Sequence, residues 1–148
     1  MEELMVIPKE FGAGVEDRLE LSVQNTEDVV RVSEAVQEFC GSHGVDAKKS
    51  YYAALCMEEM AGNIVTHGFT KDKKKHQTDI RVTYKKDELI LRIKDDCKPF
   101  DPTERKTLMD PDDPCKNIGV RMVYEIADDI DYQHMLGLNV LTMKIRLA

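Results

Sequence analysis

The stretch Met57-Glu58-Glu59-Met60-Ala61-Gly62-Asn63-Ile64-Val65-Thr66-His67-Gly68-Phe69 decides most about this chain. Within this largely apolar, helix-like segment, polar residues recur at every fourth position, at Glu59, Asn63 and His67. On an α-helix such residues lie along one stripe, each about 6 Å further along the axis. A carboxylate and a carboxamide one turn apart are the groups needed to hold a water and a hard cation beside a phosphate. The same side chains could also be the ordinary surface of an amphipathic helix, so the rest of the chain has to decide between the two interpretations.

Size and charge narrow the class of protein. A chain of 148 residues fits one domain, and a domain of that size needs no disulfide or metal to hold its core together. The net charge of −7 argues against a dedicated nucleic-acid binder, although a local site for a small anion such as a nucleotide can still be positive. No apolar run approaches the roughly 18–20 residues of a membrane span, and the acidic N-terminus carries no signal-peptide pattern. We therefore expect a cytoplasmic protein without a membrane partner.

The cysteines and histidines do not form a recognisable metal motif. The four cysteines, at positions 40, 56, 97 and 115, form no CxxC pair and have no zinc-finger spacing to a histidine. The four histidines, at positions 43, 67, 76 and 134, are scattered along the chain. The sequence therefore predicts reduced thiols and no metal cluster.

Hydrophobic periodicity predicts an α+β fold. Apolar alternation indicates strands and helical spacing indicates helices. In chain order we expect a lead-in over 1–17, a strand at 19–23, a helix capped by Asn25 or Thr26 and ending at Gly41–Gly44, a helix from Asp46 to His67–Gly68, a hairpin of strands 79–84 and 88–93, a helix over 118–127, and a hairpin of strands 130–134 and 139–147. Strands joined mainly by hairpins, with three helices, predict a two-layer sandwich. One face of the sheet is then wet and the other is covered by helices.

Two stretches break this periodicity. The basic run 71–75 reads as a solvated turn between elements. From 98 to 116 the hydrophobic pattern fails for nearly twenty residues, among four prolines and a cluster of aspartates. Long loops inside compact domains are usually functional lids or disordered segments.

Three segments could together form a nucleotide site. The first is the stripe of Glu59 and Asn63. The second is Asp95, where a strand ends, because a carboxylate there can accept a hydrogen bond from an exocyclic amine such as that of adenine. The third is the helix that opens at Asn117-Ile118-Gly119-Val120, because free N–H groups and the helix dipole at such a start favour phosphate. Taken singly, Asp95 could be a turn partner and Gly119 a packing glycine.

Taken together, these motifs resemble a known family. The run Glu59-x-x-x-Asn63-x-x-x-His67-Gly-Phe, then Asp95 followed by Pro99-Phe100-Asp101-Pro102, then Gly119, then Asn139-x-Leu141-Thr142, resembles the ATP-binding domain shared by DNA gyrase, histidine kinases and mismatch-repair ATPases. The chain is most similar to the small bacterial anti-sigma-factor serine kinases, over nearly its whole length from Leu19. The resemblance implies a Bergerat-type ATP-binding fold in one domain, 18–148. Its sheet is expected to be mixed, largely antiparallel and covered on one face by helices, with a lid at about 98–116.

The resemblance also implies roles for individual residues. Glu59 would be the general base or water-orienting carboxylate, and Asn63 would ligate Mg²⁺ through its side-chain oxygen. Asp95 would bind the adenine amine, and Gly119 with its neighbours would bind phosphates through backbone N–H groups. The other nucleotide-binding positions that it implies are Cys97, Phe100, Asn117, Ile118, Val120 and Thr142. The chain departs from the family pattern at Cys97 and Asn117, where glycines are usual.

Two functions of different classes follow from the resemblance. The first is a kinase that transfers the γ-phosphoryl of ATP to a serine or threonine of a small, anti-anti-sigma-like regulatory protein. A sigma factor would be a second partner, and a homodimer is compatible with the related kinases. The alternative is a docking module of the same fold that holds nucleotide weakly or not at all. The missing glycines favour the docking module, whereas Glu59 and Asn63 together favour the kinase.

Overall fold

The computed structural model describes residues 17–69, 76–99 and 118–147. Its elements follow the predicted order: β1 (Arg18–Val23), α2 (Thr26–Ser42), α3 (Ala47–Asn63), the π-helical turn η3 (Ile64–Gly68), β2 (Thr78–Lys85), β3 (Glu88–Asp95), α5 (Ile118–Ile126), β4 (Asp129–Met135) and β5 (Leu138–Arg146). The α+β class and the order of elements are thus confirmed. The basic run 71–75 and most of the predicted lead-in and lid lie outside the described residues.

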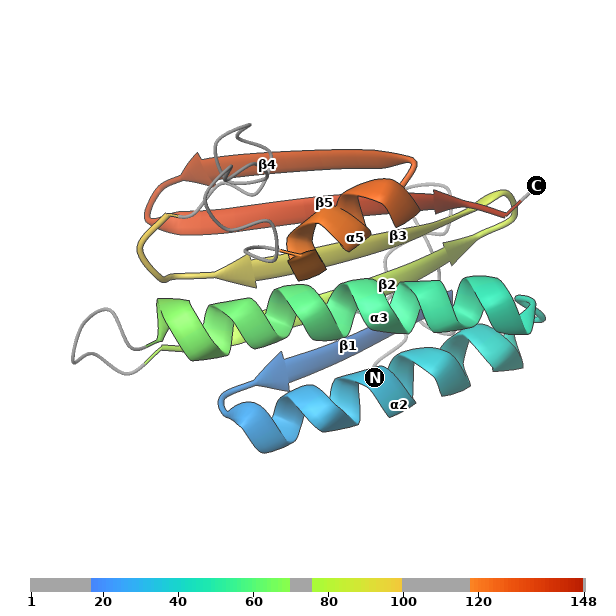
Figure 1. Cartoon of the computed structure of the whole chain (residues 1–148), viewed down its shortest axis with the longest axis horizontal. Coiled ribbons are helices and arrows are strands. Elements are labelled where there is room, and N and C mark those ends of the chain that lie inside the picture. The colour runs from blue at the N-terminus through green and yellow to red at the C-terminus, as the bar shows by residue number, and fades with distance from the viewer. Residues whose placement is uncertain (1–16, 70–75, 100–117, 148) are drawn as a thin grey trace, which may run out of the picture.

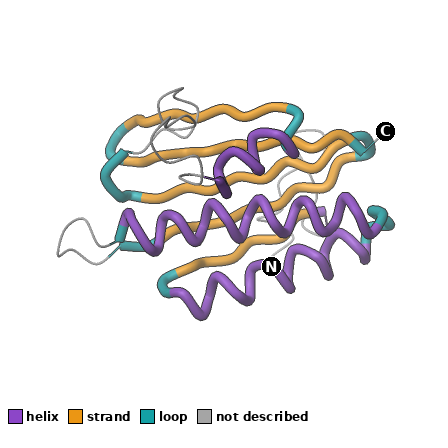
Figure 2. Tube along the Cα trace, in the orientation of Figure 1, coloured by secondary structure: helices purple, strands orange, loops and turns teal. Residues whose placement is uncertain are grey.

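The five strands form one sheet in the order β1-β2-β3-β5-β4 (Figure 2). Each pair of neighbours is antiparallel. The resemblance had implied a mixed sheet, but within the described residues the sheet is purely antiparallel. The reason lies in the closing hairpin. β4 runs in the same direction as β3, but β5 inserts between the two strands and pairs with both in antiparallel fashion.

The helices lie on one side of this sheet and enclose the core (Figure 1). Alternate residues of β3, namely Leu89, Leu91 and Ile93, are fully buried, which is the period expected of a strand with one covered face. The opposite face carries charged pairs such as Arg81 Nη2 with Glu20 Oε2 at 2.7 Å. None of the helices described is long and apolar enough to cross a membrane.

The start of α2 shows how the local sequence fixes an element boundary. The Asn25 side chain accepts a hydrogen bond from the Asp28 N–H at 2.9 Å, and Asp28 in turn accepts one from the Gln24 N–H at 2.9 Å. The first bond satisfies a donor that the first helical turn leaves without a partner in the helix, and the second ties the residue before the cap to that turn. Asn25 is therefore the N-cap, one of the two predicted candidates.

Removing this cap should weaken the fold measurably. We expect Asn25→Ala to lower the free energy of unfolding by about 1 kcal/mol, because the Asp28 N–H then loses its acceptor. Chemical denaturation followed by circular dichroism measures the change. Asn25→Ser is the matched control and should retain most of the stability, since serine also caps helices. Equal losses in both variants would show that the cap bond is not the cause.

The end of α3 departs from a regular helix. The α-helical pattern ends at Asn63 and continues as the π-helical turn Ile64–Gly68, in which the Phe69 N–H bonds to the Ile64 carbonyl at 2.9 Å. The wider turn means that regular four-residue spacing holds for Glu59 and Asn63 but not beyond them. The predicted stripe is therefore reduced to these two residues; the His67 side chain lies outside the described part.

Candidate functional site

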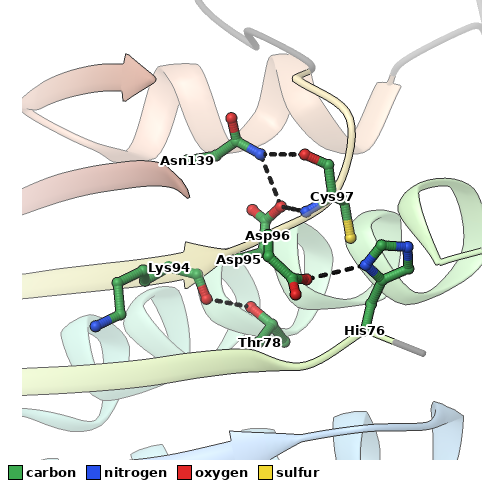
Figure 3. A network of polar contacts seen from close by, with 7 residues as sticks. All are labelled: His76, Thr78, Lys94, Asp95, Asp96, Cys97 and Asn139. Carbon is green, nitrogen blue, oxygen red and sulfur yellow. Dashed lines mark hydrogen bonds and ion pairs between the residues drawn. The ribbon is translucent and has the colours of Figure 1, made fainter. Parts of the chain in front are cut away.

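A buried polar network stands at the end of β3 (Figure 3). Asp95 Oδ1 accepts hydrogen bonds from the Cys97 N–H and from Asn139 Nδ2, both at 2.9 Å. Asn139 Nδ2 also donates to the Cys97 carbonyl at 2.8 Å. On its other side, Asn139 Oδ1 accepts from the Tyr132 hydroxyl at 3.0 Å and lies 2.7 Å from His134 Nδ1. The carboxylate of Asp95 is thus held in one orientation by neighbours that are themselves fixed.

This arrangement leaves one carboxylate oxygen of Asp95 for a ligand. Both of the hydrogen bonds that the described residues make to this carboxylate use Oδ1, and none uses Oδ2. Asp95 retains 8% exposure, so its side chain is nearly, but not completely, closed off. A buried, oriented acceptor with one open oxygen suits an amine donor on a flat base.

The start of α5 lies directly against Glu59 of α3. A side-chain carbon on Gly119 would overlap the Glu59 carboxylate, so any larger residue at 119 would displace that carboxylate from its present place. Glu59 is half-buried, whereas its neighbour Glu58 is exposed. A carboxylate is therefore held at a helix N-terminus, where backbone N–H groups also point outward.

The end of η3, which continues α3, reaches the end of β3. A side-chain carbon on Gly68 would lie 3.2 Å from both Cβ and Sγ of Cys97. The end of the helical segment therefore packs closely against Cys97, just after Asp95 and Asp96. Asn63, half-buried, lies at the last α-helical position between the Glu59 and Gly68 contacts. The structure therefore brings together the three predicted segments, which contain Glu59 with Asn63, Asp95 and Gly119.

Other candidates take different places. Val120 is 4% exposed and belongs to the hydrophobic core, so it can offer only its backbone. Ile118 opens α5, but its side chain lies outside the described part, as do Phe100 and Asn117 entirely. Thr142 stands apart from the Asp95 group. It pairs in register with Arg92 and Asp131, between two strand neighbours that face the core.

The family motif in the sequence includes Asn139, but the resemblance assigned a nucleotide-binding role to Thr142 alone on this strand. Asn139 is the register partner of Asp95 and is 2% exposed. Because side chains alternate along a strand, Asn139 shares a face with Leu141 and not with Thr142. That alternation was available in the sequence and would have pointed to Asn139.

A second polar group, also missed, lies beside the first. His76 Nδ1 is 3.0 Å from Asp96 Oδ1, and the His76 side chain is only 5% exposed. The potential ligand atoms of His76, Asp96 and Cys97 all lie within 4.8 Å of one another. The spacing of the histidines along the chain gave no sign of this grouping, in which one histidine, one aspartate and one cysteine lie together. Extending the pairing of Thr78 with Asp95 by two residues sets His76 opposite Cys97, which explains how residues twenty positions apart meet.

The fold and the site together define the class of protein. The sequence profile of the histidine kinase-like ATPase domain matches residues 23–145. The chain belongs to this family, as the motifs around Glu59, Asp95 and Gly119 had suggested. No curated protein matches the chain.

Solved structures share the fold at low sequence identity. The RsbU and RsbW domains of Rv1364c from Mycobacterium tuberculosis superpose with a TM-score of 0.65 at 15% identity, over 92% of this chain and 33% of that chain. The histidine kinase domain of the blue-light-activated kinase EL346 from Erythrobacter litoralis gives a TM-score of 0.56 at 13% identity, over 82% of this chain and 60% of that one. The present chain thus spans a third of the first protein and under two thirds of the second.

Proposed function

We propose that this chain binds ATP with Mg²⁺ and transfers the γ-phosphoryl group to a serine or threonine of a small regulatory protein, in the manner of an anti-sigma-factor kinase. The protein would act in the cytoplasm, with a sigma factor as a further partner and a homodimer as the working form. The match to the histidine kinase-like ATPase family and the fold shared with a protein that contains an RsbW domain support this proposal.

The observation that carries the proposal is the contact between Glu59 and Gly119. It places a half-buried carboxylate beside a helix N-terminus, and the glycine at this point puts no side chain between the two. The N–H groups at the start of α5 would receive the phosphates. Glu59 would then lie beside the γ-phosphate, where an acceptor hydroxyl has to be oriented. A packing glycine alone would not require a carboxylate opposite it.

The residues present also fit a magnesium ion. Mg²⁺ prefers oxygen ligands and usually binds through one or two protein groups, with phosphate oxygens and waters completing the shell. The Asn63 carboxamide oxygen, one turn from Glu59, would be the protein ligand. The ion would neutralise the charge of the triphosphate.

The reaction then uses residues of this chain for positioning and for the proton. The acceptor hydroxyl oxygen bonds to the γ-phosphorus while the bond from that phosphorus to the β–γ bridging oxygen breaks, and ADP leaves. Glu59 orients the hydroxyl and accepts its proton. Asp95 holds the adenine through its exocyclic amine, since Asn139 and the Cys97 backbone already occupy the other carboxylate oxygen.

Replacing the proposed metal ligand should separate metal from nucleotide binding. We expect Asn63→Ala to abolish the magnesium-dependent part of the ATP affinity and to leave the fold intact, because alanine is the better helix former. Calorimetric titration with ATP, once with Mg²⁺ and once with EDTA, measures the two parts. A variant that binds Mg·ATP as tightly as the parent would remove Asn63 from this role.

A docking module of the same fold remains the second candidate, and one observation favours it. Cys97 stands where the family usually has glycine, and its thiol fills the space between Gly68 and the end of β3. Such packing could leave less room for a base than a glycine would.

Label transfer distinguishes the two candidates. The chain is incubated with Mg²⁺ and ATP labelled in the γ-phosphoryl group, together with anti-anti-sigma-like proteins of the same genome. The kinase proposal predicts a labelled serine or threonine on one of them. Stable complex formation without label on any of these proteins would support the docking module instead.

A further inference from the structure

We propose that Cys97, His76 and Asp96 form a binding site for a transition metal of the zinc class, separate from the magnesium position at Asn63. The three residues supply a thiolate, an imidazole and a carboxylate from the two strand ends where β2 begins and β3 stops. The inference does not depend on the proposed kinase activity.

The donor atoms already converge. They all lie within 4.8 Å of one another, and the His76 to Asp96 distance is 3.0 Å. With zinc bonds of about 2.0–2.3 Å, tetrahedral donors on one ion lie roughly 3.3–3.6 Å apart, so side-chain shifts of about 1 Å would close the set. In Figure 3 the Cys97 sulfur and the Asp96 carboxylate point toward the same edge of the His76 ring. A Cys-His-Asp catalytic triad would instead need them at opposite nitrogens of the ring.

Neighbouring groups hold the donors in place. The Cys97 backbone is fixed on both sides, through its N–H to Asp95 and its carbonyl to Asn139. The centroid of the Phe69 ring lies 5.9 Å from that of the His76 ring, so an aromatic side chain flanks the imidazole. Outer contacts of this kind orient metal ligands and raise affinity.

The chemistry of the set selects the metal. Thiolate and imidazole suit zinc and its neighbours, whereas Mg²⁺ and Ca²⁺ prefer oxygen ligands. The negative charges of one thiolate and one carboxylate balance a divalent cation, so the occupied site would be neutral. Three protein ligands leave a fourth tetrahedral position for water or another ligand.

Cys97 also differs from the other buried thiols that the structure describes. Burial raises the pKa of Cys40 to about 11 and that of Cys56 to about 12, so both stay protonated at neutral pH. Neither belongs to a group of three metal-type ligands within the described residues. Of the three cysteines that the structure describes, Cys97 alone lies beside an imidazole and a carboxylate, so it is the thiol suited to bind a metal.

Cobalt(II) is the probe that tests the site. The reduced, metal-free full chain is titrated anaerobically with Co²⁺ in the absence of nucleotide. We expect one equivalent to bind, with the charge-transfer absorption of a cobalt–thiolate bond, and Zn²⁺ to displace it, since zinc binds such sites more tightly than cobalt. Cys97→Ser should abolish the thiolate band, and Asp96→Asn should weaken Co²⁺ binding by at least about 100-fold. Circular dichroism checks that each variant is folded.

Cys115→Ser is the matched thiol control and should leave the band unchanged. A folded parent without a cobalt–thiolate band would overturn the proposal. So would a band that survives in Cys97→Ser or disappears in Cys115→Ser. Should Cys97→Ser fail to fold, unchanged cobalt affinity in Asp96→Asn, a change at an exposed carboxylate, would overturn it as well.

Discussion

Glu59→Gln is expected to retain ATP and to lose phosphoryl transfer by about 100-fold, within the range of roughly 10²–10⁴ that a positioned general base contributes. Glutamine keeps the length and the hydrogen-bonding reach of the side chain but cannot accept the proton. Because Glu59 lies against Gly119, the substitution keeps the packing of the two helices while it removes the charge. Initial rates of label transfer, or of ATP hydrolysis where no acceptor is present, measure the loss.

The chain offers a matched control at the neighbouring position. Glu58 is exposed and lies about 100° round the helix from Glu59, so Glu58→Gln removes the same charge without reaching α5. We expect this variant to keep the parental rate. Full turnover in Glu59→Gln, or equal losses in both variants, would show that Glu59 is an ordinary helix acid.

Asp95→Asn is expected to weaken ATP binding by about 10- to 100-fold. Hydrogen bonds to charged groups contribute about 1.5–3 kcal/mol, and each 1.4 kcal/mol is a factor of ten in affinity. The amide can keep its oxygen toward Asn139 and the Cys97 N–H, which Asp95 Oδ1 now accepts from. Its nitrogen then faces the base, and this donor cannot accept a hydrogen bond from the adenine amine. Calorimetric titration with Mg·ATP measures the change.

Selectivity for the base gives a second test of this role. The carboxylate should favour ATP over GTP, because guanine presents a carbonyl where adenine has its amine, and two acceptors cannot bond. Asp87→Asn, in the exposed turn between β2 and β3, is the control and should bind ATP like the parent. Equal affinities for ATP and GTP in the parent would contradict the assignment of Asp95.

Elements governed by local rules could be predicted from the sequence. The Asn25 cap, the Asp46 cap and the Leu136-Gly137 turn each depend on residues within a few positions. The turn has positive φ at both residues, 55° and 78°, as a tight two-residue hairpin requires. The order of elements followed from these boundaries and from hydrophobic periodicity.

The site was predictable only in part, because its contacts join distant elements. Periodicity placed Glu59 and Asn63 on one helix face, but it carries no information on how closely α5 approaches them. α5 follows β3 only after some twenty residues, and the contact of Gly119 with the Glu59 carboxylate joins two distant parts of the sequence. The His76 and Cys97 pairing was within reach, since the register of a hairpin extends beyond the ends of its strands. The sequence pattern fixed which face each residue occupies and left open which residues touch.

The measurement that tests the central claim most directly is thermal unfolding of the parent and Asp95→Asn chains across a titration with Mg·ATP. A ligand that binds only the folded state stabilises it by RT ln(1 + [L]/Kd), or about 2.7 kcal/mol at one hundred times Kd. We predict a saturable rise in Tm for the parent, and a rise displaced to about 10- to 100-fold higher ATP concentration for Asp95→Asn. An unchanged Tm in the parent at millimolar Mg·ATP, or identical curves for the two chains, would contradict a nucleotide site between Asp95 and the start of α5.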